Sequence, residues 1–285
     1  MVNNDYDVAM AIPIPRDPKL DFSDVPRHWI ANNPVATAIS NGINLLFPHG
    51  ERFFVRSVHH YVKQLEDPVL QDQVKAFFKQ EGHHSSAHDD FNAILRSKGL
   101  EIDRFLARYA TVSRWFEAKL GPKLNLAGTA AAEHFTAILA EGAFASGLFE
   151  LVHPAMQRLL AWHAAEEIEH KAVAFDVLQA VDPSYALRMA GLAYATTLLA
   201  SFWLWSTIEL LRQEPLGWRG LRTYGEQMKA KESERDIDHG PVVSRVFLRG
   251  IRQYIRRDFH PRDNPNEHLA RAWFAAHGMP FTEAA

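Results

Sequence analysis

The feature that most constrains this chain is a repeated arrangement of one glutamate followed by a Glu-x-x-His pair. In chain order, the arrangement reads Glu51, Glu81–His84, Glu133, Glu167–His170. Residues three apart in an α-helix share a face, so each pair directs a carboxylate and an imidazole toward one point. Each single glutamate precedes its pair by 30 or 34 residues, and an antiparallel helix hairpin brings such positions level. The pattern predicts four helices whose acidic and imidazole side chains meet in one core.

Apolar residues recur at spacings of three and four through most of the chain, without sustained strand-like alternation. Proline and glycine steps divide this pattern, and the Pro48-His49-Gly50 step either kinks a helix or starts one. We expect helices over about 34–66, 67–98, 100–123, 125–151, 155–181 and 184–212, with shorter ones near 217–231, 241–257 and 266–277. Residues 1–285 are expected to form one all-α domain, made of an N-terminal arm (1–33), a metal-binding bundle (34–181), an apolar fifth helix (184–212) and a polar helical tail (213–285).

Composition narrows the chemistry. The chain has 285 residues, 47% of them hydrophobic, and a net charge of −3. That charge, without a concentrated basic segment, argues against a nucleic-acid partner. The absence of cysteine excludes disulfides, thiolate metal sites and cysteine nucleophiles, so His and carboxylate groups must hold any metal. The first residues lack the features of a secretory signal, which favours a cytoplasmic protein.

Several residues compete for ligand positions. Glu133 lies in an otherwise nearly uncharged stretch, where a buried carboxylate needs a partner, but Glu141 lies two turns later on an equally apolar stretch. His163 precedes Glu167 by four residues and therefore shares its helix face. His88 is open between a ligand, an outer-shell donor and an ordinary core histidine. Four neighbours of the preferred ligands also compete: His83, His134, Glu166 and Glu169.

Residues 34–181 resemble the ferritin-like di-iron carboxylate proteins in the order of Glu51, Glu81–His84, Glu133 and Glu167–His170. That resemblance implies a ferritin-like four-helix bundle with additional helices. It also implies two metal ions, with iron favoured and manganese or zinc as alternatives. Arylamine N-oxygenases of this superfamily carry a similar extra histidine at the place of His163, as a seventh ligand. The whole chain is also similar to a bacterial family labelled predicted metal-dependent hydrolase.

Two further positions bear on the reaction that this resemblance implies. Ribonucleotide reductase subunits carry a radical tyrosine where this chain has His88, so no such radical is expected. Thr136 lies one turn after Glu133, near where related oxygenases place a threonine beside the oxygen-binding face. We therefore expect an oxidase or oxygenase that uses O₂ and an electron donor to oxidise a small, largely apolar substrate, with N-oxygenation as the sharper hypothesis. The alternatives are a hydrolase that uses a metal-bridged water and a non-catalytic iron-storage bundle.

The segment 189–208 holds twenty consecutive uncharged residues, which is the length of a membrane span. It also contains five Ser and Thr hydroxyls and directly follows the metal-binding bundle. We favour a helix that is buried in the core or in a homodimer interface. A membrane span, the wall of a substrate channel and peripheral contact with a membrane surface are the alternatives.

Overall fold

The chain folds into an all-α bundle, and this confirms the fold class predicted from the sequence. The computed structural model describes residues 12–215, 217–234 and 242–281, within which the strand-like pairing is one isolated bridge between Ile30 and Val152. Parts of the expected arm (1–11) and tail (216, 235–241 and 282–285) lie outside the described residues. The helices are α1 (Pro34–Asn44), α2 (Phe47–His59), α3 (Pro68–Ser97), α4 (Asp103–Ala145), α5 (Pro154–His170), α6 (Val173–Val181), α7 (Tyr185–Leu211), α8 (Trp218–Glu234), α9 (Val242–Tyr254) and α10 (Glu267–Ala276).

Polar side chains fix the starts of three of these helices. The side chain of Asn33 accepts hydrogen bonds from two backbone N–H groups of α1, and the side chain of Asp67 accepts one from α3. Ser184 does the same for α7. Such caps satisfy N–H groups that have no partner within the helix. Helices α3 and α7 begin at these caps, and their ranges lie within one residue of those that the sequence predicts.

Two of the expected helices are each divided in the structure. The range 34–66 splits into α1 and α2, and proline occupies the first turn of α2. Proline fits there because its missing N–H would have no intrahelical partner. The range 155–181 splits into α5 and α6 at Lys171 and Ala172. The Pro48-His49-Gly50 step predicts a kink or a helix start beside the first break. Hydrophobic periodicity continues across the second break, so the sequence does not locate it.

Helix α4 consists of two helical segments that meet at a kink at Gly121, which agrees with the division that the sequence predicts between the ranges 100–123 and 125–151. Its backbone is continuous except at Gly121, where φ is 77° and Pro122 follows. Glycine adopts this left-handed conformation without steric cost. The helix ends at Ala145, earlier than the expected residue 151, and Gly147 with φ of 66° starts a short 3₁₀ turn.

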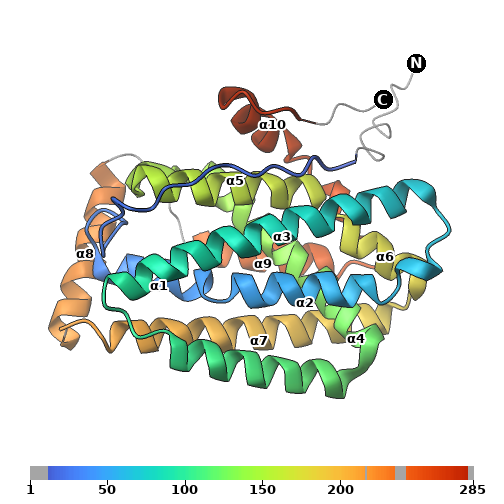
Figure 1. The fold of residues 1–285 in the computed structure, drawn as a ribbon, viewed down its shortest axis with the longest axis horizontal. Coiled ribbons are helices and arrows are strands. Elements are labelled where there is room, and N and C mark those ends of the chain that lie inside the picture. The colour runs from blue at the N-terminus through green and yellow to red at the C-terminus, as the bar shows by residue number, and fades with distance from the viewer. Residues whose placement is uncertain (1–11, 216, 235–241, 282–285) are drawn as a thin grey trace.

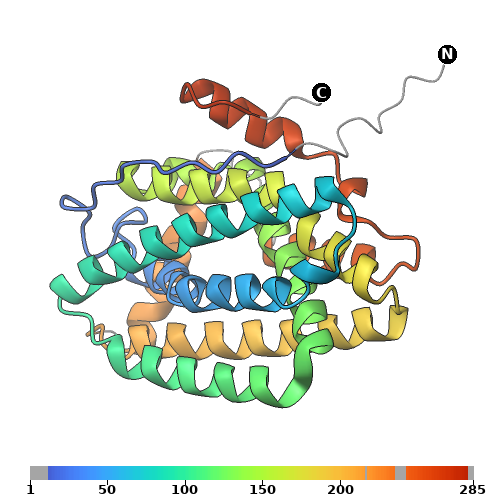
Figure 2. The same ribbon diagram turned by 45° about the vertical axis from the view of Figure 1, so that its right-hand side comes forward.

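The helices that carry the acidic pattern lie next to one another. Helix α2 packs on α3, and α4 contacts α2 and α5. The part of α4 before Gly121 runs beside α7 on the outside of the bundle (Figure 1). The extended N-terminal segment crosses α5, and α10 packs against α5 from the same side (Figures 1 and 2). Both ends of the described chain therefore cover one helix of the bundle.

Helix α7 contains the uncharged segment 189–208. Among the described residues, it is the one helix with the length and composition of a membrane span, and 28% of its most apolar window is buried within the protein. Leu192, Ala195 and Phe202 are buried, whereas Leu204 and Ile208 are exposed. One face of α7 therefore belongs to the core. A homodimer or membrane contact stays a prediction for the opposite face.

The crossing of α7 over α4 leaves no room for a side chain at Gly191. A Cβ atom there would lie 2.4 Å from the carbonyl carbon and oxygen of Ala127. We expect Gly191→Ala to lower the free energy of unfolding by about 1–3 kcal/mol, because backbone atoms must move apart. Gly82→Ala is the matched control, since no atom lies within 4 Å of its Cβ position and alanine favours the helix by about 0.5–1 kcal/mol. Urea unfolding of both variants measures the difference, and equal stability for the two would contradict this packing.

Candidate metal centre

The seven ligands predicted from the sequence converge at one place in the bundle. Each side chain is buried, and their ligand atoms form four overlapping groups in which the atoms lie within 4.8 Å of one another. Helix α2 contributes one residue, α3 two, α4 one and α5 three. The groups are Glu51–His88–His163, His84–His163–Glu167, Glu51–Glu81–His84 and Glu81–Glu133–His170. His88 is thus the one member outside the seven.

One part of the centre surrounds the imidazole of His170. Its Nε2 lies 3.2 Å from Oε1 of Glu81, 3.2 Å from Oε2 of Glu133 and 3.4 Å from Oε2 of Glu167. Three carboxylates from three helices therefore approach a single nitrogen. This is a set of oxygen and nitrogen donors that suits a divalent cation.

The other part of the centre surrounds His84 and His163. Nε2 of His163 lies 2.8 Å from Oε1 of Glu167 and 3.6 Å from Oε1 of Glu51. Nδ1 of His84 lies 3.6 Å from Oε1 of Glu81 and 3.8 Å from Oε1 of Glu167. Glu81 and Glu167 therefore contact imidazoles in both parts of the centre, so these two carboxylates lie between them.

The oxygens of three of the four carboxylates in the centre lack a hydrogen-bond partner among the described residues. Both carboxylate oxygens of Glu51, Glu81 and Glu133 are buried without a hydrogen-bond partner among the described residues. The same holds for Nδ1 of His84 and Nε2 of His170. Leaving a buried carboxylate unpaired costs several kcal/mol. Because these atoms face one another, bound cations would satisfy them together, and the residues fit a metal centre.

The pKa values of these groups also indicate that the buried carboxylates need cations or protons beside them. Burial raises the pKa of Glu51 well above its usual value, and the neighbouring carboxylates raise it further. Burial and the charge of Glu167 raise the pKa of Glu81 and of Glu133 to about 8. Burial acts on Glu167 in the same direction, but the adjacent imidazoles outweigh it and hold that pKa well below its usual range. Burial would lower the pKa of His170, yet Glu167 and Glu133 hold it well above its usual value.

A chain of hydrogen bonds sets the orientation of His163. Asn44 donates from Nδ2 to Oδ1 of Asn92 at 3.0 Å and accepts at Oδ1 from Nδ1–H of His88 at 2.6 Å. Burial and the nearby imidazoles hold the pKa of His88 well below its usual value. Its Nε2 is then an acceptor for Nδ1–H of His163, at 2.7 Å. Nε2 of His163 consequently faces the carboxylates, 2.8 Å from Oε1 of Glu167, and is the ring nitrogen that a bound metal ion would use.

His84 and His170 are oriented in the same manner. Nε2–H of His84 donates to Oε2 of Glu166 at 2.9 Å, so Nδ1 faces the centre. Nδ1–H of His170 donates to Oε1 of Gln80 at 2.9 Å, so Nε2 faces the centre. Sequence reasoning treated Glu166 as a competing ligand and did not single out Gln80. Glu166 and Gln80 each precede a predicted ligand by one residue. Only the three-dimensional contacts show that they orient His84 and His170.

The remaining competitors lie outside the centre. Glu141 forms an ion pair with Arg249 at 3.2 Å and accepts a hydrogen bond from Asn266 at 3.0 Å, whereas Glu133 lies in the cluster. The other three bond elsewhere: His83 to the carbonyl of Arg16, His134 to the carbonyl of Gly250, and Glu169 to Arg16 and Gln80.

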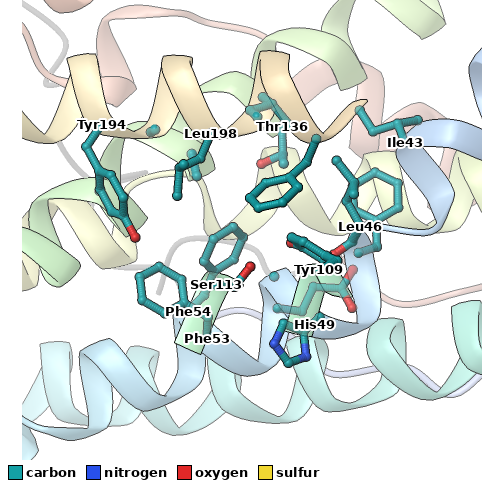
Figure 3. A pocket seen from close by; sticks show the side chains of 18 of the residues that line it. Ile43, Leu46, His49, Phe53, Phe54, Tyr109, Ser113, Thr136, Tyr194 and Leu198 are labelled. Carbon is teal, nitrogen blue, oxygen red and sulfur yellow. The ribbon is translucent and has the colours of Figure 1, made fainter. Parts of the chain in front are cut away.

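A largely apolar pocket of about 120 Å³ adjoins the centre between α2, α4 and α7. Glu51 and Thr136 are part of its lining, and the Thr136 hydroxyl contacts the carbonyl of Glu133 and Oε2 of Glu167. Figure 3 shows Thr136, Phe54 and Leu198 around this space. Its other lining residues include Ile43, Leu46, Phe53, Tyr109, Ser113, Ala132, Tyr194 and Phe202.

The raised pKa values predict how the metal-free protein responds to pH. The folded state keeps protons on Glu51, Glu81 and Glu133 that the unfolded chain loses above about pH 4.5. Below about pH 6.5, the lowered pKa values of His88, His134 and His163 act in the opposite direction, because these imidazoles take up protons only on unfolding. We therefore expect stability to fall as the pH rises from about 6.5 to about 8, by up to about 1.4 kcal/mol per pH unit for each carboxyl group. His170 has a raised pKa, so its contribution is also lost as the pH rises.

Urea unfolding of chelator-treated protein across this range measures the slope. Loading with a divalent metal should flatten it, because metal ligands are deprotonated. A metal-free stability that rises with pH would contradict these assignments.

Comparison with protein families gives an independent result. A family model described as "predicted metal-dependent hydrolase" matches residues 14–265, a range that includes every member of the metal centre. Neither a curated protein nor a solved structure gives a significant match to the chain. Because the family model covers far more than half of the 285 residues, the chain belongs to the predicted metal-dependent hydrolase family.

Proposed function

We propose that the protein is a dimetal enzyme that acts on a small, largely apolar substrate. The observation that carries the proposal is the cluster of buried carboxylate and imidazole atoms without partners, beside an apolar pocket. Two divalent ions, with iron favoured and manganese or zinc as alternatives, would be held by Glu51, Glu81, His84, Glu133, His163, Glu167 and His170. Bound metals of this kind polarise substrates and activate water, and iron also exchanges electrons with O₂.

The arrangement of ligands supports a place in the ferritin-like superfamily. In ferritin-like dimetal proteins, two helices each supply a Glu and two supply a Glu-x-x-His motif. Here α2 and α4 carry the single glutamates, and α3 and α5 carry the pairs. Glu81 and Glu167, which contact imidazoles in both parts of the centre, are the carboxylates that we assign between the two metals.

The family description favours hydrolysis over oxidation, and we take hydrolysis as the first candidate reaction. Its substrate would be an ester or a related compound with an apolar group. The apolar lining would hold that group and exclude bulk water, while Glu51 and Thr136 place the reacting bond next to the centre. The Thr136 hydroxyl contacts Oε2 of Glu167, so it would orient this carboxylate or exchange a proton with it.

The donor set and the pocket favour a second candidate, the oxidation of an apolar substrate with O₂. His163 lies within the cluster as an added imidazole, like the seventh ligand that led us to expect N-oxygenation. The pocket is apolar, and about 150 Å³ of apolar space holds a benzene molecule. A ring-sized amine would fit a space of this order. This reaction requires an electron donor in addition to O₂.

One experiment separates the two candidates. Metal-free protein is loaded under strict anaerobiosis with Zn²⁺ or Fe²⁺ and is assayed with p-nitrophenyl esters and with anilines, before and after O₂ and a reductant are added. Hydrolysis requires ester turnover with Zn²⁺ and without O₂, because water is the only co-substrate. Amine oxidation that needs Fe²⁺, O₂ and the reductant, without ester turnover, would favour oxidation. Failure of the metal-free protein to bind either metal would refute the dimetal enzyme itself.

The pocket also predicts the effect of a single substitution. Ala132 lines the pocket, and Ala132→Leu adds three carbon atoms to a space of about 120 Å³. We expect kcat/KM for the preferred substrate to fall by about tenfold or more, since each displaced apolar contact costs on the order of 1 kcal/mol. Metal content should not change. Ala193→Leu on the exposed face of α7 is the control, and an equal loss in both variants would argue against substrate binding in this pocket.

A further inference from the structure

One buried arginine lies behind the metal centre. Arg16 belongs to the N-terminal extended segment and is 7% exposed. Its Nη1 donates to Oε1 of Glu166 at 3.1 Å and to Oε2 of Glu169 at 2.8 Å, while its Nη2 donates to Oε1 of Glu169 at 3.0 Å. The backbone N–H of Arg16 also donates to Oε1 of Glu166, at 3.1 Å. A single guanidinium therefore bridges two carboxylates of α5.

The first of these carboxylates leads to His84. Oε1 of Glu166 accepts from Arg16, and Oε2 accepts from Nε2–H of His84 at 2.9 Å. Both oxygens are used, so Glu166 cannot turn without losing one partner. A carboxylate held in this manner fixes the tautomer and the ring orientation of a ligating histidine. Arg16 thus acts on His84 through one intermediate side chain.

The second carboxylate leads to His170. Oε2 of Glu169 accepts from Arg16 and from Nε2–H of Gln80 at 2.7 Å. The same Gln80 amide accepts at Oε1 from Nδ1–H of His170 at 2.9 Å. The hydrogen bond to Glu169 fixes the orientation of the Gln80 amide, because the carboxylate can only accept and the amide NH₂ group must therefore face Glu169. The oxygen is then directed at His170, so Arg16 also orients this ligand.

The C-terminal end of the described chain holds Arg16 in place. Its guanidinium lies 3.5 Å from the centre of the Phe274 ring of α10. Nε and Nη2 donate to the carbonyl of Pro280 at 3.1 and 2.6 Å, and Nη1 donates to the carbonyl of Ile14 at 2.7 Å. Every guanidinium nitrogen is therefore bonded, and the planar group is fixed in one orientation, as a bidentate arginine allows.

We propose that Arg16 is a positioning residue for the metal centre, setting His84 and His170 through Glu166 and through Glu169 with Gln80. The inference rests on the proposed function, because it assumes that these histidines bind metal. It adds that the centre depends on a residue outside the four-helix bundle, which the N-terminal segment supplies and the C-terminal tail holds. Loss of such outer-shell partners lowers metal affinity by about 10–100-fold.

The test compares Arg16→Gln with wild type in the full chain. Metal-free protein is titrated with Zn²⁺ in competition with a chromophoric chelator, and the melting temperature is recorded with and without Zn²⁺. We expect about 10–100-fold weaker Zn²⁺ affinity and a smaller metal-induced rise in melting temperature. A purely structural role would lower the melting temperature of both forms equally and leave the affinity unchanged. Wild-type affinity in folded Arg16→Gln protein would overturn the proposal.

Two further variants complete the experiment. Arg27→Gln is the control, since Arg27 lies on the same N-terminal segment but pairs with Glu214 at 3.0 Å, and its Zn²⁺ affinity should equal that of wild type. Gln80→Met removes the acceptor for His170 and leaves every charge in place. If Arg16→Gln does not fold, unchanged affinity in Gln80→Met overturns the proposal and weaker affinity supports it. Absence of Zn²⁺ binding by wild type would instead refute the proposed function.

Discussion

Mutual repulsion among four buried carboxylates is the constraint on which the rest of this structure depends. Each comes from a different helix, and burial makes their charges strongly unfavourable unless cations or protons offset them. Apolar clusters on either side hold the helices together against this repulsion. Along α3, Phe77 belongs to one cluster and Phe91 to the other, and Glu81 and His84 lie between them. The apolar layers thus provide the stability, and the polar layer between them provides the chemistry.

The sequence predicts the inner part of the centre because its information is local. Residues three or four apart on one helix share a face, so Glu-x-x-His pairs are readable without a structure. The single glutamates follow from hairpin geometry in the same manner. The sequence does not decide between Glu133 and Glu141 as a ligand, because the pairing of Glu141 depends on Arg249 of α9, which is 108 residues away. The helix break at residues 171–172 is not predicted, because apolar periodicity continues across it. The break at 45–46, in contrast, lies beside the Pro48-His49-Gly50 step, which indicates a kink or a helix start.

The outer part of the centre is non-local, and sequence reasoning could not assemble it. Arg16 is 150 residues from Glu166 and 264 residues from Pro280. Asn44, the last residue of α1, is hydrogen-bonded to His88 of α3, and His88 is hydrogen-bonded to His163 of α5. No spacing rule connects such positions. A charged side chain is almost never buried without partners, so the burial of Arg16 points to its role. Its burial becomes visible only once α10 and α5 are placed around it.

Lys171, at the break between α5 and α6, bonds outside the carboxylate cluster. Lys171 is 4% exposed, and a buried ammonium next to four carboxylates would pair with them and compete with metal ions. Instead its Nζ donates to the carbonyl of Asn264 and to Oδ1 of Asn266, each at 2.6 Å, and pairs with Glu267 at 2.7 Å. All three acceptors belong to the C-terminal segment that also holds Arg16. That segment therefore contacts two buried cations of the fold: Arg16, which bonds to Glu166 and Glu169 of α5, and Lys171, which bonds to the segment itself and not to the carboxylate cluster.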